Sequence, residues 1–469
     1  MSLVNRSLVT IDDLSNQEIE VIFSLAEEMS DSIDKQSNLC QGKIMASLFF
    51  EPSTRTRLSF EAAMHRLGGN VISATGIGTT SLSKGESIAD MARVVGSYAD
   101  IIVVRHPWEG AAKVVADYAG VPVINAGDGS HEHPTQTLCD LYTLLKEKKT
   151  IEGLKIAVWG DLKYGRTVHS LIYALARLGA TILFRSGPGL ELPEHVVTKL
   201  STEYKGKLKK LEELNQSVKE KLFPLDAIYV TPGRPHQLTM IPDINIQVEL
   251  KKGVDAIYVT RLQKERLAPM AEERGLEEYY PVVNKKLLKR KELNRTLIMH
   301  PLPRILELTY DVDADPRSMY FKQAARGVPI RMALIALLLG AKKVNIPEEK
   351  EPPFAKKTDY PVYNRYFAVK CRNPNCVSVQ ETERRYIVPE FKITATKPLT
   401  LRCIYCEHES HPPYVASTEG NRKYHSAHSL VLEEIKPEHL IIFDSEEEAG
   451  QRGFSPSQYA HIPAKRGRD

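Results

Sequence analysis

The sequence is short of cysteine, of net charge and of long apolar runs. Its 469 residues include six cysteines, too few for a disulfide-stapled secreted protein of this length. Lysine and arginine number 63 and aspartate and glutamate 59, and this net charge of +4 gives no reason to expect a nucleic-acid or membrane partner. The apolar run Met332–Ala341 is shorter than the roughly 20 residues of a membrane helix, and Asp12 and Asp13 argue against a signal peptide. We therefore expect a globular cytoplasmic protein of about three domains.

Short β-type runs alternate with helical runs along the first 340 residues. One series begins with a strand at 43–50 and a helix at 53–67, and ends with a long helix from about 133 to 146. A second series begins with a strand at 155–160 and closes with a helix at 318–339. Because parallel strands need long crossovers and are buried on both faces, this rhythm predicts an α/β protein with two doubly wound parallel-sheet domains, at 1–148 and 149–341.

The remainder of the chain divides by composition. Residues 342–361 carry many Lys, Glu and Pro and indicate a linker. Four of the six cysteines fall in a predicted small β-rich domain at 362–415, and 416–469 form a polar tail of unknown role. Within the second domain, the hexapeptide Asp-Ala-Ile-Tyr-Val-Thr occurs at 226–231 and again at 255–260. A local duplication and two similar buried strands explain this repeat equally well.

Three segments place polar side chains at the carboxyl ends of predicted strands, the edge at which ligands bind in such folds. Ser53–Thr56 opens a helix, where backbone N–H groups, hydroxyls and a guanidinium together suit a phosphate. Arg105 lies at the end of a later predicted strand, and His133 opens the predicted helix that begins at about 133. Taken alone, each segment is explained by an ordinary helix cap or a surface arginine. Taken together, the three segments predict an anion site in which His133 donates a hydrogen bond to a carbonyl oxygen.

Four segments resemble the signature segments of the carbamoyltransferases, in the same order and at compatible spacing: Ser53–Thr56, Val104–Pro107, His133–Gln136 and His300–Pro303. The resemblance covers essentially residues 1–340. It implies the carbamoyltransferase fold, with carbamoyl phosphate bound between two domains and its carbamoyl group transferred to an amine. It also implies a homotrimer with active sites shared between subunits.

The second domain resembles that of aspartate carbamoyltransferases at Asp161–Thr167 and Thr260–Arg266. Ornithine enzymes carry a Cys in the segment that is His300–Pro303 here and a Ser-Met-Gly motif at 261–263, and this chain has neither. Arg166 and Arg261 suit two carboxylates. The resemblance therefore implies L-aspartate as the acceptor and N-carbamoyl-L-aspartate as the product, a step of de novo pyrimidine biosynthesis.

The resemblance also implies roles for individual residues. The residues expected to bind carbamoyl phosphate are Ser53, Thr54, Arg55, Thr56, Arg105, His133, Gln136, Leu302 and Pro303. Those expected to bind L-aspartate are Lys84, Arg166, Arg261 and Gln263, with Lys84 reaching into a neighbouring subunit's site. The catalytic residues are expected to be Arg55, Thr56, Lys84, Arg105 and His133. No cofactor is expected for the transfer, because alignment and electrostatics suffice.

The clustered cysteines have the spacing of a metal site. Cys371-x4-Cys376 and Cys403-x2-Cys406 predict one structural zinc ion per chain, with four thiolates that leave no open position for catalysis. Their surroundings resemble the zinc domain of the aspartate carbamoyltransferase regulatory chain, a separate polypeptide in that family and here fused. Only 30 residues separate Gly340 from the first of these cysteines, so we expect the regulatory chain's nucleotide-binding domain to be missing.

Two other functions remain open at this point. The chain could carbamoylate a different amine, although Arg166 and Arg261 count against a cationic acceptor. It could also be a non-catalytic assembly partner whose zinc ribbon binds protein or nucleic acid. The intact phosphate-binding and carboxylate-binding residues and the mild charge count against that reading.

Overall fold

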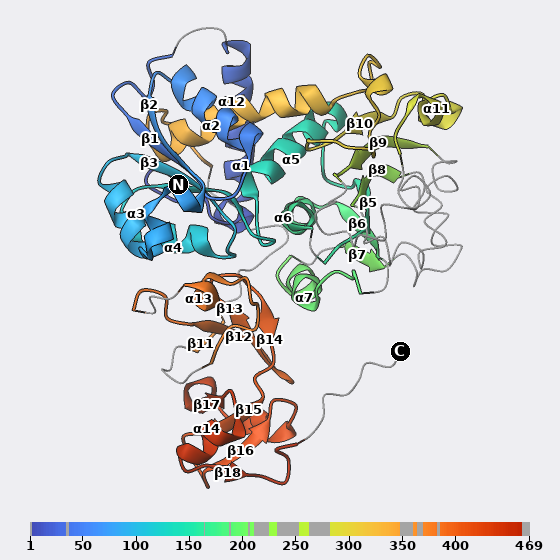
Figure 1. Cartoon of the computed structure of the whole chain (residues 1–469). Helices are drawn as coiled ribbons and strands as arrows, with labels where there is room; N and C mark the ends of the chain where they lie inside the picture. Colours follow the sequence, from blue (N-terminus) through green and yellow to red (C-terminus); the bar gives the residue numbers. More distant parts are fainter. Residues whose placement is uncertain are drawn as a thin grey trace.

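The structure is a computed structural model that describes residues 2–33, 37–163, 165–186, 189–204, 207–210, 225–231, 253–261, 282–347, 360–363, 369–381 and 385–461. Two α/β domains lie side by side, and two small β-rich modules follow one another below them (Figure 1). Within these ranges, no helix is long and apolar enough to cross a membrane.

The first domain is built on four parallel strands in the order β2-β1-β3-β4. The strands are β1 (Ile44–Phe49), β2 (Asn70–Thr75), β3 (Ile101–His106) and β4 (Val123–Asp128). The helices are α1 (Asn16–Asp31), α2 (Thr54–Arg66), α3 (Ile88–Gly96), α4 (Ala111–Tyr118) and α5 (Pro134–Lys148), with 3₁₀ turns η1 (Ile11–Asp13), η2 (Ile77–Thr79) and η3 (Ser81–Lys84). The inner strand β3 is buried throughout, as expected of a parallel strand covered on both faces. The edge strand β4 is buried as well and is hydrogen-bonded to the segment around Leu8, whereas the other edge strand, β2, stays half-exposed.

The second domain has six parallel strands in the order β10-β9-β8-β5-β6-β7. These are β5 (Lys155–Gly160), β6 (Thr181–Ser186), β7 (Lys207–Lys210), β8 (Leu225–Val230), β9 (Val254–Val259) and β10 (Leu297–Met299). The helices are α6 (Arg166–Arg177), α7 (Glu194–Thr202), α11 (Lys285–Leu288) and α12 (Tyr320–Leu338), with 3₁₀ turns η9 (Lys291–Leu293) and η10 (Tyr310–Val312). The predicted pair of parallel-sheet domains is therefore confirmed.

The repeated hexapeptide forms two neighbouring strands of this second sheet. β8 and β9 pair in parallel with the two copies in register, so that Tyr229 lies beside Tyr258. Their rings stack with centroids 4.2 Å apart. Both strands are buried between helical layers, which is the environment that selects Ile, Tyr and Val.

The long helix α12 joins the two domains. It leaves the second domain after β10 and packs against α1, α2 and α5 of the first (Figure 1). Its apolar residues, such as Ile330 and Leu334, belong to one core that includes residues of both sheets. The two domains therefore share buried surface along this helix.

The cysteine-rich module is an antiparallel sheet in the order β11-β12-β13-β14. It consists of β11 (Val362–Tyr363), β12 (Phe391–Thr396), β13 (Leu399–Cys403), β14 (Glu409–Ser410) and α13 (Val377–Gln380). Its core is continuous with that of the first domain, since Val377 and Phe391 belong to the same buried cluster as Ile88 and Val114. The module is therefore packed onto its own chain.

The segment from 416 onward, which the sequence marks only as a polar tail, folds within the described residues as a second module. A sheet in the order β17-β15-β16-β18 combines β15 (Tyr414–Ser417), β16 (Lys423–Ser426), β17 (Leu440–Phe443) and β18 (Ser455–Pro456) with α14 (Glu446–Gln451) and 3₁₀ turns η11 (Leu430–Glu434) and η12 (Pro437–His439). A small core around Tyr424 and Phe443 holds it together. Strands of four residues are too short to show periodicity in the sequence, and the polar composition conceals this core.

Candidate active site and metal centre

Two of the predicted site residues meet at the carboxyl edge of the first sheet. Arg105 lies near the end of β3, and His133 precedes α5 in the loop that follows β4. A Cβ atom at Gly127 would lie 3.2 Å from Nη1 of Arg105 and 3.5 Å from Cδ2 of His133. The guanidinium and the imidazole therefore flank the same glycine, whose φ of +117° and missing side chain make this approach feasible.

The Arg105 side chain is buried and held in a fixed direction. Its Nη2 donates to Oε1 of Glu51 (3.1 Å), and its Nη1 donates to the backbone carbonyl of Ala126 (3.3 Å). Glu51 lies two residues before Ser53, the residue that precedes α2. Arg105 is thereby tied to the helix whose N-terminus is predicted to bind phosphate, so its charge is already in position before a ligand arrives.

His133 is positioned from the second domain. Its backbone N–H donates to Oγ of Ser170 on α6 (3.1 Å), and that hydroxyl donates to Oε2 of Glu132 (2.7 Å). All three residues are buried. Burial raises the pKa of Glu132 to about 8. The loop that carries His133 is therefore clamped at the boundary between the domains.

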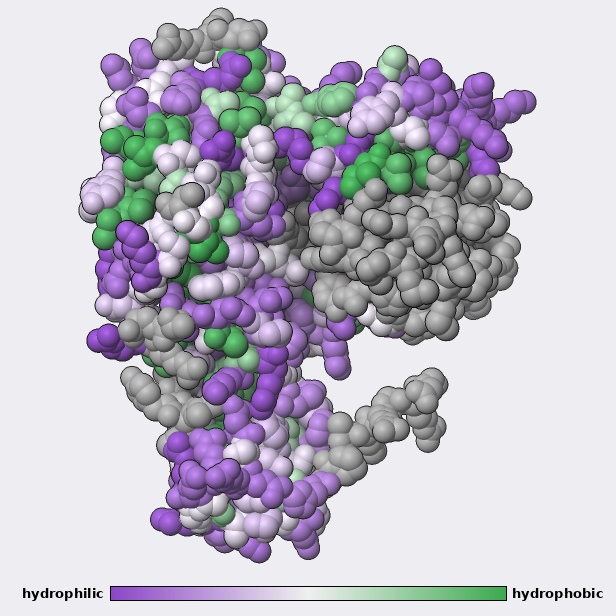
Figure 2. Space-filling model, in the orientation of Figure 1, coloured by the Kyte–Doolittle hydropathy of each residue, from purple (hydrophilic) through white to green (hydrophobic). Residues whose placement is uncertain are grey.

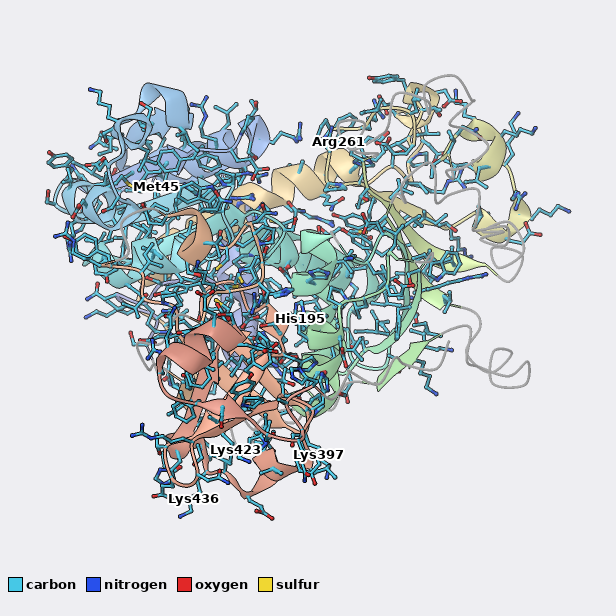
Figure 3. The ribbon with its side chains drawn as sticks, turned by 60° about the horizontal axis from the view of Figure 1, so that its bottom comes forward. Met45, His195, Arg261, Lys397, Lys423 and Lys436 are labelled. Atoms are coloured by element: carbon cyan, nitrogen blue, oxygen red, sulfur yellow. The ribbon has the colours of Figure 1, made fainter. Side chains whose placement is uncertain are left out.

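The two arginines predicted for different substrates lie in different domains and interact electrostatically across that boundary. Arg55 lies in the first turn of α2, and Arg261 follows β9 in the second domain. Burial lowers the pKa of Arg55, and the positive charge of Arg261 lowers it further. Figure 3 shows Arg261 on the side of the second domain that faces the first. Like charges repel, and an anion bound near both guanidiniums relieves that repulsion, so the pair suits a site for anionic substrates.

The segment predicted to supply carbonyl groups is braced by a buried pair. The backbone N–H of Leu302 donates to Nδ1 of His300 (2.7 Å), so the ring proton lies on Nε2, which donates to Oε1 of Glu307 (3.0 Å). Both partners are fully buried, and burial lowers the pKa of His300. Leu302 has a left-handed φ of 53°. This bracing fixes the backbone of Leu302 and Pro303 at the edge of the second sheet.

The structure does not bring all predicted residues together within one chain. Lys84 is exposed at the end of η3. Ser53 precedes α2, with Thr54 and Thr56 in its first turn. Gln263 lies outside the described residues, as does the side chain of Arg166, the first residue of α6.

Sequence reasoning missed a buried hydrogen-bond centre behind Gln136. Nε2 of Gln136 donates to Oδ1 of Asp140 (2.9 Å), which also accepts from Tyr258 and Gln323. Asp140 lies one helical turn after Gln136 on α5. That i, i+4 spacing was the one signal available in the sequence.

The four clustered cysteines form a compact set of sulfur donors. Their Sγ atoms all lie within 4.8 Å of one another, with 3.5 Å between Cys371 and Cys406 and 3.8 Å between Cys376 and Cys403. A tetrahedral zinc ion with Zn–S bonds of about 2.3 Å needs sulfurs about 3.8 Å apart. All four are buried. The donor set therefore fits a closed four-thiolate metal site, and it is the one such cluster within the described ranges.

The cysteine-rich module contacts both α/β domains. On the first, Val377 N–H donates to the Glu109 carbonyl and Glu109 N–H donates to the Asn375 carbonyl (both 2.9 Å). On the second, Oε2 of Glu407 lies 2.8 Å from Nζ of Lys199, which also lies 2.8 Å from Asp12. His195 of the same helix, α7, faces the module (Figure 3) and packs against His408.

Glu407 also reaches the loop that carries His133. Nε2 of His131 lies 3.9 Å from Glu407, and its Nδ1 lies 3.0 Å from Asp128. Burial opposes the charge on His131, yet these two carboxylates raise its pKa well above the usual value. The Glu407 carboxylate therefore lies between His131 of the first domain and Lys199 of the second.

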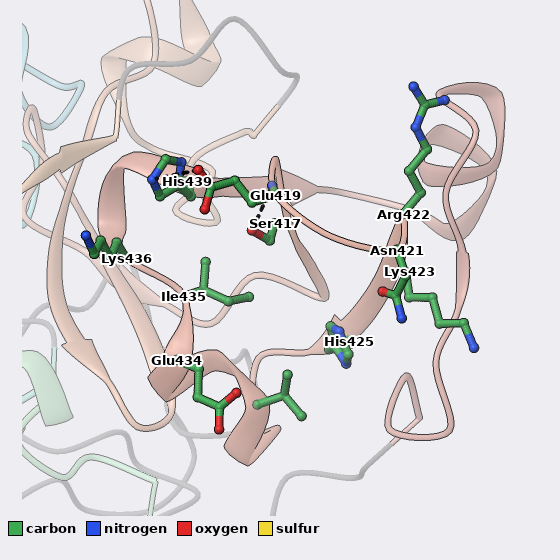
Figure 4. Close-up of a pocket in the computed structure, with 11 residues that line it drawn as sticks. Ser417, Glu419, Asn421, Arg422, Lys423, His425, Glu434, Ile435, Lys436 and His439 are labelled. Atoms are coloured by element: carbon green, nitrogen blue, oxygen red, sulfur yellow. Dashed lines mark hydrogen bonds and ion pairs between the residues drawn. The ribbon is translucent and has the colours of Figure 1, made fainter.

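A separate hollow of about 300 Å³ lies in the last module, between the β15–β16 turn and the 3₁₀ segments (Figure 4). Two of its basic residues, Arg422 and Lys423, extend away from it, and His439 faces Glu419 at 3.5 Å. Its lining offers no convergent set of polar groups comparable to the edge of the first sheet.

Family models match most of the chain. The carbamoyl-phosphate-binding domain of aspartate/ornithine carbamoyltransferases matches residues 6–146, and the Asp/Orn-binding domain matches residues 236–338. The metal-binding domain of the aspartate carbamoyltransferase regulatory chain matches residues 363–412. The chain belongs to the aspartate/ornithine carbamoyltransferase family.

Its relatives lie on the aspartate side of that family. The aspartate carbamoyltransferase catalytic subunit of Thermoplasma acidophilum is 43% identical over 340 residues, covering 72% of this chain and 99% of the relative. The solved catalytic subunit of the Methanocaldococcus jannaschii enzyme has a TM-score of 0.56 at 42% identity, covering 71% of this chain and 98% of that one. The Trypanosoma cruzi enzyme, solved with carbamoyl phosphate and aspartate, has a TM-score of 0.56 at 33% identity, covering 72% and 96%. The resemblance to a catalytic chain fused to a regulatory-chain zinc domain is confirmed.

Proposed function

We propose that this chain transfers the carbamoyl group of carbamoyl phosphate to the amine of L-aspartate, giving N-carbamoyl-L-aspartate and phosphate. The observation that carries the proposal is the convergence of Arg105 and His133 at Gly127, together with the electrostatic interaction of Arg55 with Arg261 of the second domain. Relatives named aspartate carbamoyltransferase and a relative solved with both substrates support it. In this role the chain acts in pyrimidine biosynthesis.

Carbamoyl phosphate fits the edge of the first sheet. Its phosphate accepts from the N-terminus of α2 and from Ser53, Thr54 and Arg55, where the helix dipole and the guanidinium stabilise the charge of the departing phosphate. Thr56, Arg105 and His133 donate to the carbonyl oxygen and make its carbon more electrophilic. The amino group donates to Gln136 and to the backbone carbonyls of Leu302 and Pro303.

L-Aspartate is held from the second domain by Arg166, Arg261 and Gln263. Its uncharged α-amine attacks the carbamoyl carbon, a tetrahedral intermediate forms, and the C–O bond to phosphate breaks. The departing phosphate takes the proton that the amine loses. No covalent bond to the protein is needed, so the protein contributes alignment and fixed charge.

A homotrimer completes the site in this proposal. Lys84 is exposed and is assigned to the aspartate site of a neighbouring subunit. Apolar side chains on the same domain are also exposed, including Leu58 on α2, Ile72 on β2 and Tyr98 after α3. Figure 2 shows hydrophobic residues gathered on this domain, whereas the face of the last module is hydrophilic. Contiguous exposed apolar surface is typical of a subunit interface.

The metal is assigned to the four cysteines as one structural zinc ion per chain. Four thiolates close its coordination shell, so it stabilises the module and takes no part in the transfer. A cytoplasmic location stays a prediction from the composition.

A colorimetric assay for the carbamoylated product tests the function. Wild-type protein should form product with L-aspartate and not with L-ornithine, whose cationic side chain the arginines repel. Arg55→Ala should lower kcat by at least about 10²-fold, the usual cost of losing one donor to a developing charge. Arg66→Ala, at the other end of α2, is the matched control and should retain activity. No product from wild type with L-aspartate would refute the proposal.

Mixed trimers test the shared site. Lys84→Gln and Arg55→Ala should each be nearly inactive alone. Trimers assembled from both variants should recover part of the activity. In such trimers some sites combine the unaltered Arg55 of a Lys84→Gln subunit with the unaltered Lys84 of an Arg55→Ala subunit. Absence of recovery in trimers shown to be mixed would place Lys84 outside its neighbour's site.

A further inference from the structure

Asp140 is a buried carboxylate directly behind the candidate carbamoyl site. It lies on α5 with 1% of its surface exposed. Nε2 of Gln136 and Nε2 of Gln323 each donate to its Oδ1 at 2.9 Å, and the Tyr258 hydroxyl lies 3.1 Å from both oxygens. These partners come from α5, α12 and β9. Asp140 therefore ties together elements of both domains.

The carboxylate dictates how both glutamine amides are turned. An ionised carboxylate has no hydrogen to donate, so each amide must present its NH₂ group to Asp140. For Gln323 a second contact supports this orientation. Its Oε1 accepts the backbone N–H of His300 (3.1 Å), and a backbone N–H can only donate.

Because the NH₂ group of Gln136 binds Asp140, its amide oxygen points away from Asp140. The amino group of carbamoyl phosphate is a donor, so it needs this oxygen as its acceptor. If the Gln136 amide were reversed, its NH₂ group would face the amino group of the ligand, and two donors would oppose each other. Gln323 links the same carboxylate to the backbone of His300, which precedes the Leu302 and Pro303 carbonyls assigned to that amino group.

We propose that Asp140 is a positioning residue that turns the amide oxygen of Gln136 toward the amino group of carbamoyl phosphate and thereby selects carbamoyl over acyl phosphates. This inference rests on the proposed function, because it takes carbamoyl phosphate as the ligand of Gln136. Burial raises the pKa of Asp140 to about 7, although its three donors oppose the rise. The test is therefore made at about pH 8.5, where the group is ionised.

Binding of carbamoyl phosphate and acetyl phosphate, measured by calorimetry in the cold, separates the two groups. Acetyl phosphate carries a methyl group where carbamoyl phosphate carries its amino group. Both glutamines donate to the same oxygen, Oδ1 of Asp140, so an Asn there could accept from both and leave Gln136 turned as before. Asp140→Leu removes the acceptor at similar volume, so the Gln136 amide is no longer held with its oxygen toward the ligand. Carbamoyl phosphate affinity should fall about 10- to 100-fold, as for a buried unpaired polar group, and acetyl phosphate affinity less than about threefold.

Companion variants show whether Asp140 acts through Gln136. Gln136→Met should lose the same selectivity, and the double variant should lose no more than either single one. Tyr258→Phe keeps the bond between Asp140 and Gln136 and should retain selectivity. Asp100→Leu makes the same substitution at a carboxylate that accepts the backbone N–H of Ile44 at the start of β1, and this control should bind as wild type does.

Inorganic phosphate shows that the folded site is intact, because it uses the α2 end and not Gln136. Should Asp140→Leu lose phosphate binding, Asp140→Ser replaces it, since a hydroxyl either donates or accepts and no longer fixes the amide. Selectivity retained in a phosphate-binding variant, or equal binding of both ligands by wild type, overturns the inference. Wild type that binds carbamoyl phosphate selectively but transfers nothing to L-aspartate refutes the proposed function instead.

Discussion

The contact of Glu407 with both catalytic domains gives a quantitative prediction for Glu407→Gln. Removing one partner of a fully buried ion pair costs about 3–5 kcal/mol. Here Lys199 keeps Asp12 at 2.8 Å and His131 keeps Asp128 at 3.0 Å, and the Glu407 side chain is 24% exposed. We therefore expect a smaller loss of docking free energy, about 1–3 kcal/mol.

The loss of docking free energy can be measured at two backbone hydrogen bonds between the module and the first domain. The amides of Val377 and Glu109 each donate across this docking surface, so they exchange with solvent only when the module lifts off or unfolds. A loss of about 1–3 kcal/mol should speed their hydrogen exchange about 5- to 150-fold. Mass spectrometry of peptides that cover these amides measures the rates.

The control for this experiment is Glu28→Gln. Glu28 pairs with Lys342 at 2.7 Å on the surface, and its side chain is 63% exposed. Such a pair contributes about 0–1 kcal/mol, and it lies on other elements, so exchange at the docking surface should not change. Metal content is measured alongside, because Glu407 follows Cys406. Exchange within about twofold of wild type in metal-loaded Glu407→Gln would refute the assignment of docking free energy to Glu407.

Further outcomes are expected from the metal site, from Asp140 and from nucleotides. Cys403→Ser should lose the zinc that elemental analysis finds at one per wild-type chain, and retention of a full equivalent would contradict the four-thiolate assignment. Because burial raises the pKa of Asp140 from 3.8 to about 7, the folded protein retains a proton that the unfolded chain releases. The contribution of Asp140 to stability is therefore present at low pH and is lost as the pH rises through about 7. Asp140→Asn cannot titrate, so the fall in Tm between about pH 4 and 7 should be flatter than in wild type. An identical Tm profile would refute the raised pKa. CTP and ATP should leave the rate with L-aspartate unchanged, since a nucleotide-binding domain is expected to be missing, and a clear effect of either would contradict that expectation.

The sequence predicts the first two domains well because their information is local. The strands are continuous apolar runs, and the residues of the phosphate site follow strand ends, where a parallel sheet collects them. Their positions after neighbouring strands therefore predict that Arg105 and His133 lie together.

The supports of that site were not predictable, because they join residues far apart in the chain. Ser170 lies 37 positions after His133, and Gln323 lies 183 positions after Asp140. No periodicity links such pairs, and a buried Asp or Ser on a helix is indistinguishable in sequence from a surface one. The docking contact of Glu407 with Lys199 spans 208 positions and was missed for the same reason.

Because the cysteine-rich module packs onto the catalytic domains of its own chain, its docking does not depend on the protein concentration. A partner supplied by a second polypeptide associates in proportion to its concentration, whereas a partner on the same chain docks at an effective concentration in the millimolar range. Each catalytic body is therefore matched to one module at any protein concentration. Unequal synthesis of two subunits, or dissociation at low abundance, cannot leave a catalytic body without it.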